Sequence, residues 1–208
     1  MGMPSTFTSW SFPRAKTILP DECGRILAKA ANTDPRLYVF LATGANTGLR
    51  LCEVLHIRAE DVIDGQLRIV RRKKKQLKAD MIDVTPALAA VLQDWSQMYA
   101  DGWLFPGRAK PCLIQHSNGI VEQVCSGGHM CKRVIQHRWQ VLLESLDLAM
   151  EGRGIHALRH FAVTAFYAKT RDLRAAQVFA GHSSSVITER YARCLEMKEM
   201  VHSMPTVL

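Results

Sequence analysis

The sharpest pattern of potentially reactive side chains in the sequence is His156-Ala-Leu-Arg159-His160. Positions i, i+3 and i+4 of a helix share one face, so a helix here would present two imidazoles and a guanidinium together. These groups are suited to proton transfer and to binding an anion such as a phosphate. Taken alone, the pattern is more typical of a basic surface patch or of histidines that are hydrogen-bonded in the core.

Two further patterns contain side chains of similar kinds. Arg50 precedes Glu53 by one turn in Thr47-Gly-Leu-Arg-Leu-Cys-Glu, a spacing that usually gives an exposed helical ion pair of small energetic value. Gly181-His182 is followed by Tyr191, and a tyrosine on a helix usually serves amphipathic packing. Each of these patterns is weak by itself.

The charge balance favours a polyanionic partner. The 208 residues include 27 Lys and Arg against 19 Asp and Glu, a net charge of +8. Such a surplus favours nucleic acid above other partners. Part of the excess lies in one window without an acidic residue, which contains Arg71, Arg72, Lys73, Lys74, Lys75 and Lys78. On charge alone, this run is equally typical of a solvated turn.

Taken in order along the chain, these patterns resemble the tyrosine recombinase (phage integrase) family. The similarity lies in the identity, order and spacing of Thr47-Gly-Leu-Arg-Leu-Cys-Glu53, a hairpin lysine, His156-Ala-Leu-Arg-His160, Ala180-Gly-His182 and Tyr191-Ala192. It extends from about residue 17 to residue 195. The ordered set is far more specific than any of its parts.

The resemblance implies a role for each matching residue. Arg50 and Arg159 match the two arginines that clamp the scissile phosphate, and Tyr191 matches the nucleophile that forms a covalent 3′-phosphotyrosyl link. His156 matches the residue placed to take or share the tyrosine proton, and His182 matches a further phosphate contact.

A hairpin lysine matches the general acid that protonates the departing 5′-oxygen. Counting back from the expected strand at Ile82-Asp-Val84 favours Lys75, whereas counting forward from Arg50 gives Lys74. Lys75 is the first choice, Lys74 the second and Lys73 the third. The remaining cations of the run are expected to contact DNA phosphates: Arg71, Arg72, Lys73 and Lys74. Glu53 is expected to support Arg50, and His160 to brace the site.

The family resemblance implies a site-specific recombinase that breaks and rejoins double-stranded DNA as a homotetramer on paired sites. It implies no metal, nucleotide or other cofactor, because the phosphotyrosyl bond retains the energy of the diester and cations stabilise the charge. One alternative is a type IB topoisomerase-like enzyme that relaxes DNA. Another is a non-catalytic DNA-binding regulator with a vestigial site.

The expected fold is α+β and mainly helical, with a small antiparallel three-stranded sheet near the N-terminal third. Residues 1–16 are expected to form an arm, and 17–208 one catalytic domain with a short tail at about 192–208. Helices are expected from 20 to about 32–35, near 36–42, 49–57, 85–95, 130–148, 156–169 and 172–180, and from about 184 through Tyr191, with a break at 43–48. A loop of about 20 residues is expected after Gly107, and the region from Lys110 to Met130 has no assigned role.

Further features of the sequence limit the class of protein that is expected. There is no secretory signal pattern and no apolar run long enough for a membrane helix, so a soluble protein in the compartment where it is made is expected. The family resemblance implies a cytoplasmic protein of prokaryotic or phage origin. The resemblance implies a separate DNA-clamping domain before the catalytic one in most relatives, and at most 16 residues precede it here. The chain is therefore expected to be either an excised catalytic domain or a member of the short single-domain relatives. A cluster of metal-ligand types lacks a CxxC pair or an HxxxH helix, so no metal site is predicted from Cys112, His116, Cys125, His129 and Cys131.

Overall fold

The computed structural model describes residues 18–73, 76–99, 102–107, 110–116, 119–125 and 128–181. Its helices and strands follow the chain in the order α1 (Pro20–Thr33), α2 (Pro35–Thr47), α3 (Leu51–Leu55), a 3-10 turn (Ala59–Asp61), β1 (Val62–Ile63), β2 (Gln66–Lys73), β3 (Gln76–Asp83), α4 (Pro86–Gln97), β4 (Lys110–His116), β5 (Gly119–Cys125), α5 (Lys132–Glu144), α6 (His156–Thr170) and α7 (Leu173–Ala180). The mainly helical α+β class with a small antiparallel sheet is confirmed.

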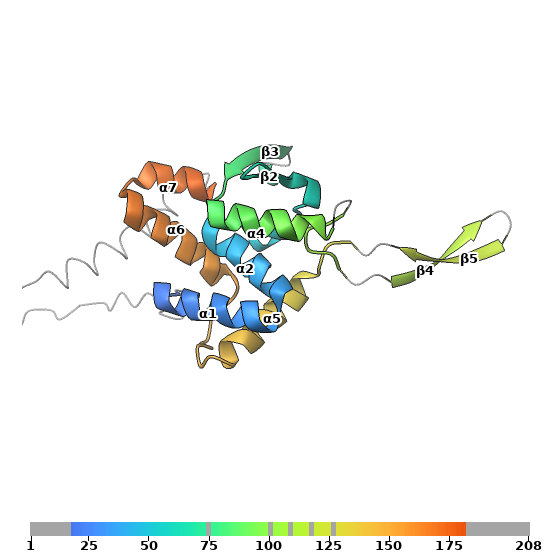
Figure 1. The fold of residues 1–208 in the computed structure, drawn as a ribbon, viewed down its shortest axis with the longest axis horizontal. Helices are drawn as coiled ribbons and strands as arrows, with labels where there is room; N and C mark the ends of the chain where they lie inside the picture. The colour runs from blue at the N-terminus through green and yellow to red at the C-terminus, as the bar shows by residue number, and fades with distance from the viewer. Residues whose placement is uncertain are drawn as a thin grey trace, which may run out of the picture.

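Helix α2 forms the centre of the molecule. It packs against α1, α4 and α6, and Figure 1 shows it between these neighbours. Phe40 and Leu41 of α2 are buried, and the ring of Phe40 meets that of Phe105 edge to face at 5.2 Å between centroids. On the far side of the core, the indole of Trp139 in α5 donates to the carbonyl of Arg153 at 3.0 Å. Burial of these large apolar groups fixes the helices that position the site.

The expected break of the second helix at 43–48 is wrong, because α2 continues to Thr47. Thr43 and Thr47 donate their hydroxyl protons to the carbonyls of Val39 and Thr43, at 2.7 and 2.6 Å, so both polar side chains are satisfied inside the buried helix. The helix ends at Gly48, which adopts a left-handed conformation with φ 63°. A Cβ at Gly48 would lie 3.0 Å from the ring of Phe179, so a side chain there would crowd α7.

The three-stranded sheet has the order β1-β2-β3 and is antiparallel throughout. The turn at Asp64-Gly65 has positive φ at both residues, and it joins β1 to β2 as the Asp-Gly signal predicts. Strand β2 alternates: Leu67 and Ile69 are buried against the helices, whereas Val70 is 46% exposed. Period-2 alternation therefore gives β2 an inner face, and Arg71 continues it.

The expectation of a loop of about 20 residues after Gly107 is wrong. Residues 110–116 pair with 119–125 as an antiparallel hairpin, β4–β5, which Figure 1 shows projecting from the helical body. At its base, Gly107 donates to the carbonyl of Gly128 at 2.7 Å, and Pro106 forms a bridge with His129. Cross-strand hydrogen bonds thus hold this segment in regular structure without a strong apolar alternation in the sequence.

Candidate active site

The turn between α2 and α3 presents Arg50. Its guanidinium donates from Nη1 to Oε1 of Glu53 at 2.8 Å, and its backbone N–H donates to Oε2 of the same carboxylate at 2.7 Å. The Glu53 side chain is 7% exposed and the Arg50 side chain 41% exposed. The carboxylate thus orients a guanidinium that still reaches solvent, which agrees with the predicted supporting role of Glu53.

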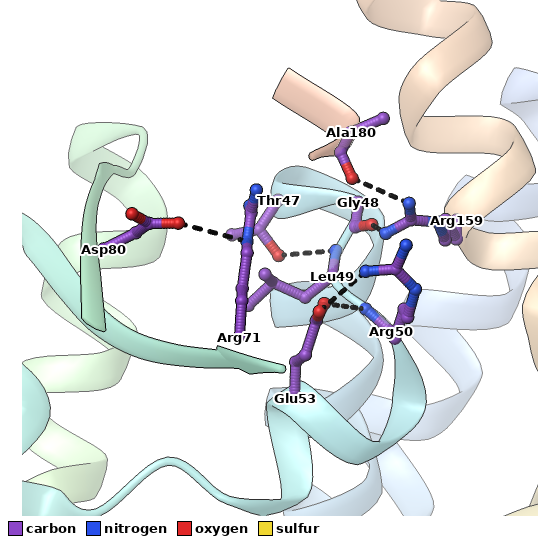
Figure 2. A network of polar contacts seen from close by, with 9 residues as sticks. All are labelled: Thr47, Gly48, Leu49, Arg50, Glu53, Arg71, Asp80, Arg159 and Ala180. Carbon is purple, nitrogen blue, oxygen red and sulfur yellow. Dashed lines mark hydrogen bonds and ion pairs between the residues drawn. The ribbon is translucent and has the colours of Figure 1, made fainter. Parts of the chain in front are cut away.

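Arg159 reaches the same turn from α6. Its Nη1 donates to the carbonyl of Gly48 at 2.6 Å, and its Nη2 donates to the carbonyl of Ala180 at 2.7 Å. The residue is buried, so the interpretation of this segment as a basic surface patch is wrong for Arg159. Figure 2 shows Arg159 and Arg50 lying together beside Gly48. The tertiary structure therefore brings together two arginines that are 109 positions apart in the sequence.

His156 is the first residue of α6 and is exposed, one helical turn before Arg159. It lines a shallow depression between α2, α3 and α6 whose other walls include Leu49, Leu51 and Arg159. His160, on the same helix, is half-buried. The positive end of the α6 dipole points into this region, so three favourable features for an anion meet there: two guanidiniums and a helix N-terminus.

Arg71 of the basic run also reaches this region. The residue is buried, so the solvated-turn interpretation does not hold for it. Its Nε lies 3.9 Å from Oδ2 of Asp80 on β3, and its guanidinium packs against Gly181 at the end of α7. Sequence reasoning placed Arg71 with the DNA-contacting cations but missed Asp80. The alternation Leu67, Ile69, Arg71 was the signal that both belong to an inner face.

Other predicted residues are only partly accounted for. The backbone of Arg72 and Lys73 ends strand β2, where Lys73 pairs with Gln76. The predicted general acids Lys75 and Lys74, His182, the nucleophile Tyr191, the arm at 1–16 and the tail at 192–208 lie outside the described residues.

Of the five residues of metal-ligand type, Cys112 and His116 lie on β4 and Cys125 on β5, and side-chain contacts are described for the other two. The ring of His129 packs against those of His56 and Trp103, with centroids 4.3 and 5.4 Å apart, and Cys131 is an exposed free thiol. Within the described ranges, no three His, Cys, Asp or Glu side chains are grouped as metal ligands. In the same ranges, no helix is long and apolar enough to cross a membrane.

Comparison with known proteins identifies the family. The sequence model of the phage integrase family matches residues 16–197. The chain belongs to this family. Two proteins of Sinorhizobium fredii strain NGR234, y4eF and y4qK, whose names describe them as candidate integrase/recombinases, are each 28% identical to it over 191 residues. The matches cover 89% of this integrase-family chain and 67% and 54% of the two relatives.

Solved structures show the same fold at low identity. XerA recombinase superposes with a TM-score of 0.67 at 18% identity, over 98% of this chain and 67% of that one. The XerH site-specific recombinase bound to its difH substrate superposes with a TM-score of 0.64 at 19% identity, over 90% of this chain and 52% of that one. The integrase-family chain thus spans about half of the XerH chain.

Proposed function

We propose that this phage integrase family member is a site-specific recombinase that cuts and rejoins double-stranded DNA through a 3′-phosphotyrosyl intermediate. The observation that carries the proposal is the convergence of two oriented arginines at Gly48. Arg159 donates to the Gly48 carbonyl at 2.6 Å, and Arg50 follows two positions later with its guanidinium fixed to Glu53. Structural partners that hold guanidiniums in place before substrate arrives are what charge stabilisation requires.

The proposed reaction requires these arginines to stabilise developing negative charge. Attack on a phosphodiester builds negative charge on the two non-bridging oxygens, and guanidinium groups can bind such oxygens through paired hydrogen bonds. Arg50 and Arg159 supply that charge stabilisation from two different elements. Because they are already oriented, little reorganisation accompanies the transition state.

Tyr191 is the proposed nucleophile. Its oxygen attacks the scissile phosphorus, forms the 3′-phosphotyrosyl bond and displaces a 5′-hydroxyl. His156 takes or shares the tyrosine proton, His182 contacts the phosphate, and a lysine of the β2–β3 hairpin protonates the leaving oxygen, with Lys75 as first choice and Lys74 as second. Reversal of the same step with a new 5′-hydroxyl rejoins the strand, so neither ATP nor a metal ion is required.

The substrate and assembly follow from the same proposal. The net charge of +8 suits double-stranded DNA, and the remaining cations Arg71, Arg72, Lys73 and Lys74 are proposed to meet its phosphates. Solved relatives include a λ integrase tetramer bound to a Holliday junction. A homotetramer on paired DNA sites is proposed here, with the site of action in the cytoplasm.

The test is covalent capture of DNA. Wild-type protein is mixed with a pool of nicked duplexes of random sequence, then denatured, and protein-linked DNA is recovered and sequenced. Tyr191→Phe should abolish the adduct while leaving DNA binding within a few fold, because only the nucleophilic oxygen is lost. The matched control is Tyr38→Phe, which removes a half-buried hydroxyl on α2 and should keep the adduct.

Three results would overturn the proposal. An adduct that survives in Tyr191→Phe would mean that another residue is the nucleophile. Binding without any adduct from wild-type protein would favour the non-catalytic regulator. Relaxation of a supercoiled plasmid without paired sites would instead favour the topoisomerase-like alternative.

A further inference from the structure

Arg71 carries a buried positive charge with little compensation. Its side chain is 9% exposed, and its buried Nε has no hydrogen-bond partner among the residues that the structure describes. The carboxylate of Asp80 lies 3.9 Å from that Nε, which is too far for a hydrogen bond. A guanidinium removed from water normally requires a closely bonded anion, so this one is poorly satisfied in the DNA-free protein.

The surroundings of Arg71 place it beside the two clamping arginines. Gly181, with φ 61°, packs directly on the guanidinium, and a Cβ at this position would lie 2.6 Å from Cζ of Arg71. The preceding residue, Ala180, accepts the hydrogen bond from Arg159. Arg71 and Arg159 therefore contact consecutive residues at the end of α7, and Figure 2 draws both arginines together with Arg50 and Ala180.

A purely structural brace would have a different form. Arg153 is also buried and its Nε also lacks a hydrogen-bond partner among the described residues, but its Nη1 donates to the carboxylate of Glu22 at 3.2 Å and to the carbonyl of Leu148 at 3.1 Å, and so joins α1 to the segment after α5. Arg71 lies in a comparably buried place, and the carboxylate that it faces, that of Asp80, is beyond hydrogen-bonding distance. The missing anion would complete its coordination.

We propose that Arg71 is a third guanidinium of the scissile-phosphate site, held near Asp80 in the free protein and bound to a non-bridging phosphate oxygen in the DNA complex. This assignment rests on the proposed recombinase function and extends it. It moves Arg71 from the general DNA-contacting cations to the catalytic centre. It also gives Gly181 a role, since any side chain at this position would displace the guanidinium.

The test compares Arg71→Met with Arg68→Met. Both replace an arginine of β2 by an unbranched apolar side chain, but Arg68 lies on the opposite face, where it pairs with Asp61 at 2.6 Å. On the nicked duplex recovered by covalent capture, Arg71→Met should form the adduct about 100-fold more slowly than wild type, as expected for loss of one oriented donor to the transition state. Arg68→Met should stay close to the wild-type rate.

A methylphosphonate at the scissile position separates a phosphate contact from a folding defect. Replacing one non-bridging oxygen by methyl removes the charge that the guanidinium would stabilise, so Arg71→Met should recover most of its rate relative to wild type on one of the two stereoisomers. A slow rate on phosphate and both methylphosphonates alike would make Arg71 structural and overturn the proposal. So would a wild-type rate for Arg71→Met on ordinary DNA.

A binding measurement keeps this inference separate from the proposed function. If wild-type protein forms no adduct, the recombinase proposal fails, and the salt dependence of binding to a random uncut duplex then decides the phosphate contact. In Arg71→Met, loss of one phosphate contact should reduce the log–log slope of DNA-binding affinity against salt concentration by about one. An unchanged slope there would overturn the assignment of Arg71 as well.

Discussion

The helical half of the site and its sheet half hold their cations in different ways. Arg159 in α6 spans two backbone carbonyls, and Arg50 shares a carboxylate with its own backbone N–H. On the sheet, Arg71 faces Asp80 across 3.9 Å. The helical guanidiniums are therefore fixed before DNA arrives, whereas the cation on β2 is left with a weak partner.

This difference matches two kinds of chemical demand. Charge on the non-bridging oxygens has to be stabilised throughout cleavage, which favours donors fixed by the core. In the proposed reaction, delivery of a proton to the leaving oxygen happens at one moment, and a lysine of the β2–β3 hairpin is proposed to supply that proton. The comparison predicts that substitutions in the helical half reduce the cleavage rate strongly, and that modified DNA does not restore it. Substitutions in the sheet half are expected to reduce a cleavage rate that modified DNA restores.

The largest effect is expected at the helical arginines. Arg50→Ala and Arg159→Ala should each slow adduct formation by at least about 1000-fold, because each removes an oriented charge from the transition state. Arg159→Ala should also lower Tm, since it breaks two hydrogen bonds between separate elements, whereas exposed Arg50 should change Tm little. Rates come from covalent capture and Tm from calorimetry.

Arg159→Lys is the matched control for charge. An ammonium keeps the charge but cannot span the carbonyls of Gly48 and Ala180 with a planar fork, so the rate should stay low. Near wild-type cleavage by Arg159→Lys would show that orientation by the two carbonyls is unimportant, and the contrast between the halves would fail.

A conditional loss is expected at the hairpin lysine. Lys75→Ala should cleave ordinary DNA about 100-fold more slowly, and should recover when sulfur replaces the 5′-bridging oxygen. A thiolate leaves without a proton because free thiols have a pKa of about 8.5, far below that of an alcohol. Arg50→Ala should show no such recovery.

The same substitution at Lys74 and Lys73 locates the general acid. Sulfur rescue confined to Lys74→Ala would move the role by one position. Lys73 is the last residue of β2, where it pairs with Gln76. Sulfur rescue confined to Lys73→Ala would therefore place the general acid on the strand itself.

A smaller effect is expected at Arg72. Arg72→Gln removes the positive charge, so it should reduce the log–log slope of DNA-binding affinity against salt concentration by about one. The cleavage rate at saturating DNA should change little. Fluorescence anisotropy over a range of salt concentrations gives the slope. A slope equal to that of wild type would mean that this part of the basic run is a solvated turn.

The smallest effect is expected from shortening the β4–β5 hairpin. Its ends already meet through the 2.7 Å hydrogen bond between Gly107 and Gly128, so a short turn can replace residues 108–127. Tm should stay at the wild-type value, because the core lies in the helical body. A marked fall in Tm would show that the hairpin contributes to the fold as β2–β3 does.

Much of the architecture could be predicted from local patterns. Pro20, Thr85-Pro86 and Asp172 mark the starts of α1, α4 and α7, and each lies where the structure begins the helix. The predicted boundaries of helices and loops were wrong where burial in the tertiary structure overrode the local secondary-structure propensity. The Thr43–Thr47 segment stays helical because its hydroxyls bond within the helix, and residues 110–125 pair in spite of a weak apolar pattern.

The sequence by itself determined the family and the identity of the candidate residues, because the residue types and their order are chemical requirements that are encoded locally. It could not determine which arginines are buried or what orients them. Arg50, Arg71 and Arg159 come from three elements, and their meeting depends on the packing of α2, α6 and the sheet. Only the tertiary structure decided that Arg71 is buried beside Asp80 and Gly181, since one residue of strand register turns a side chain from solvent to the core.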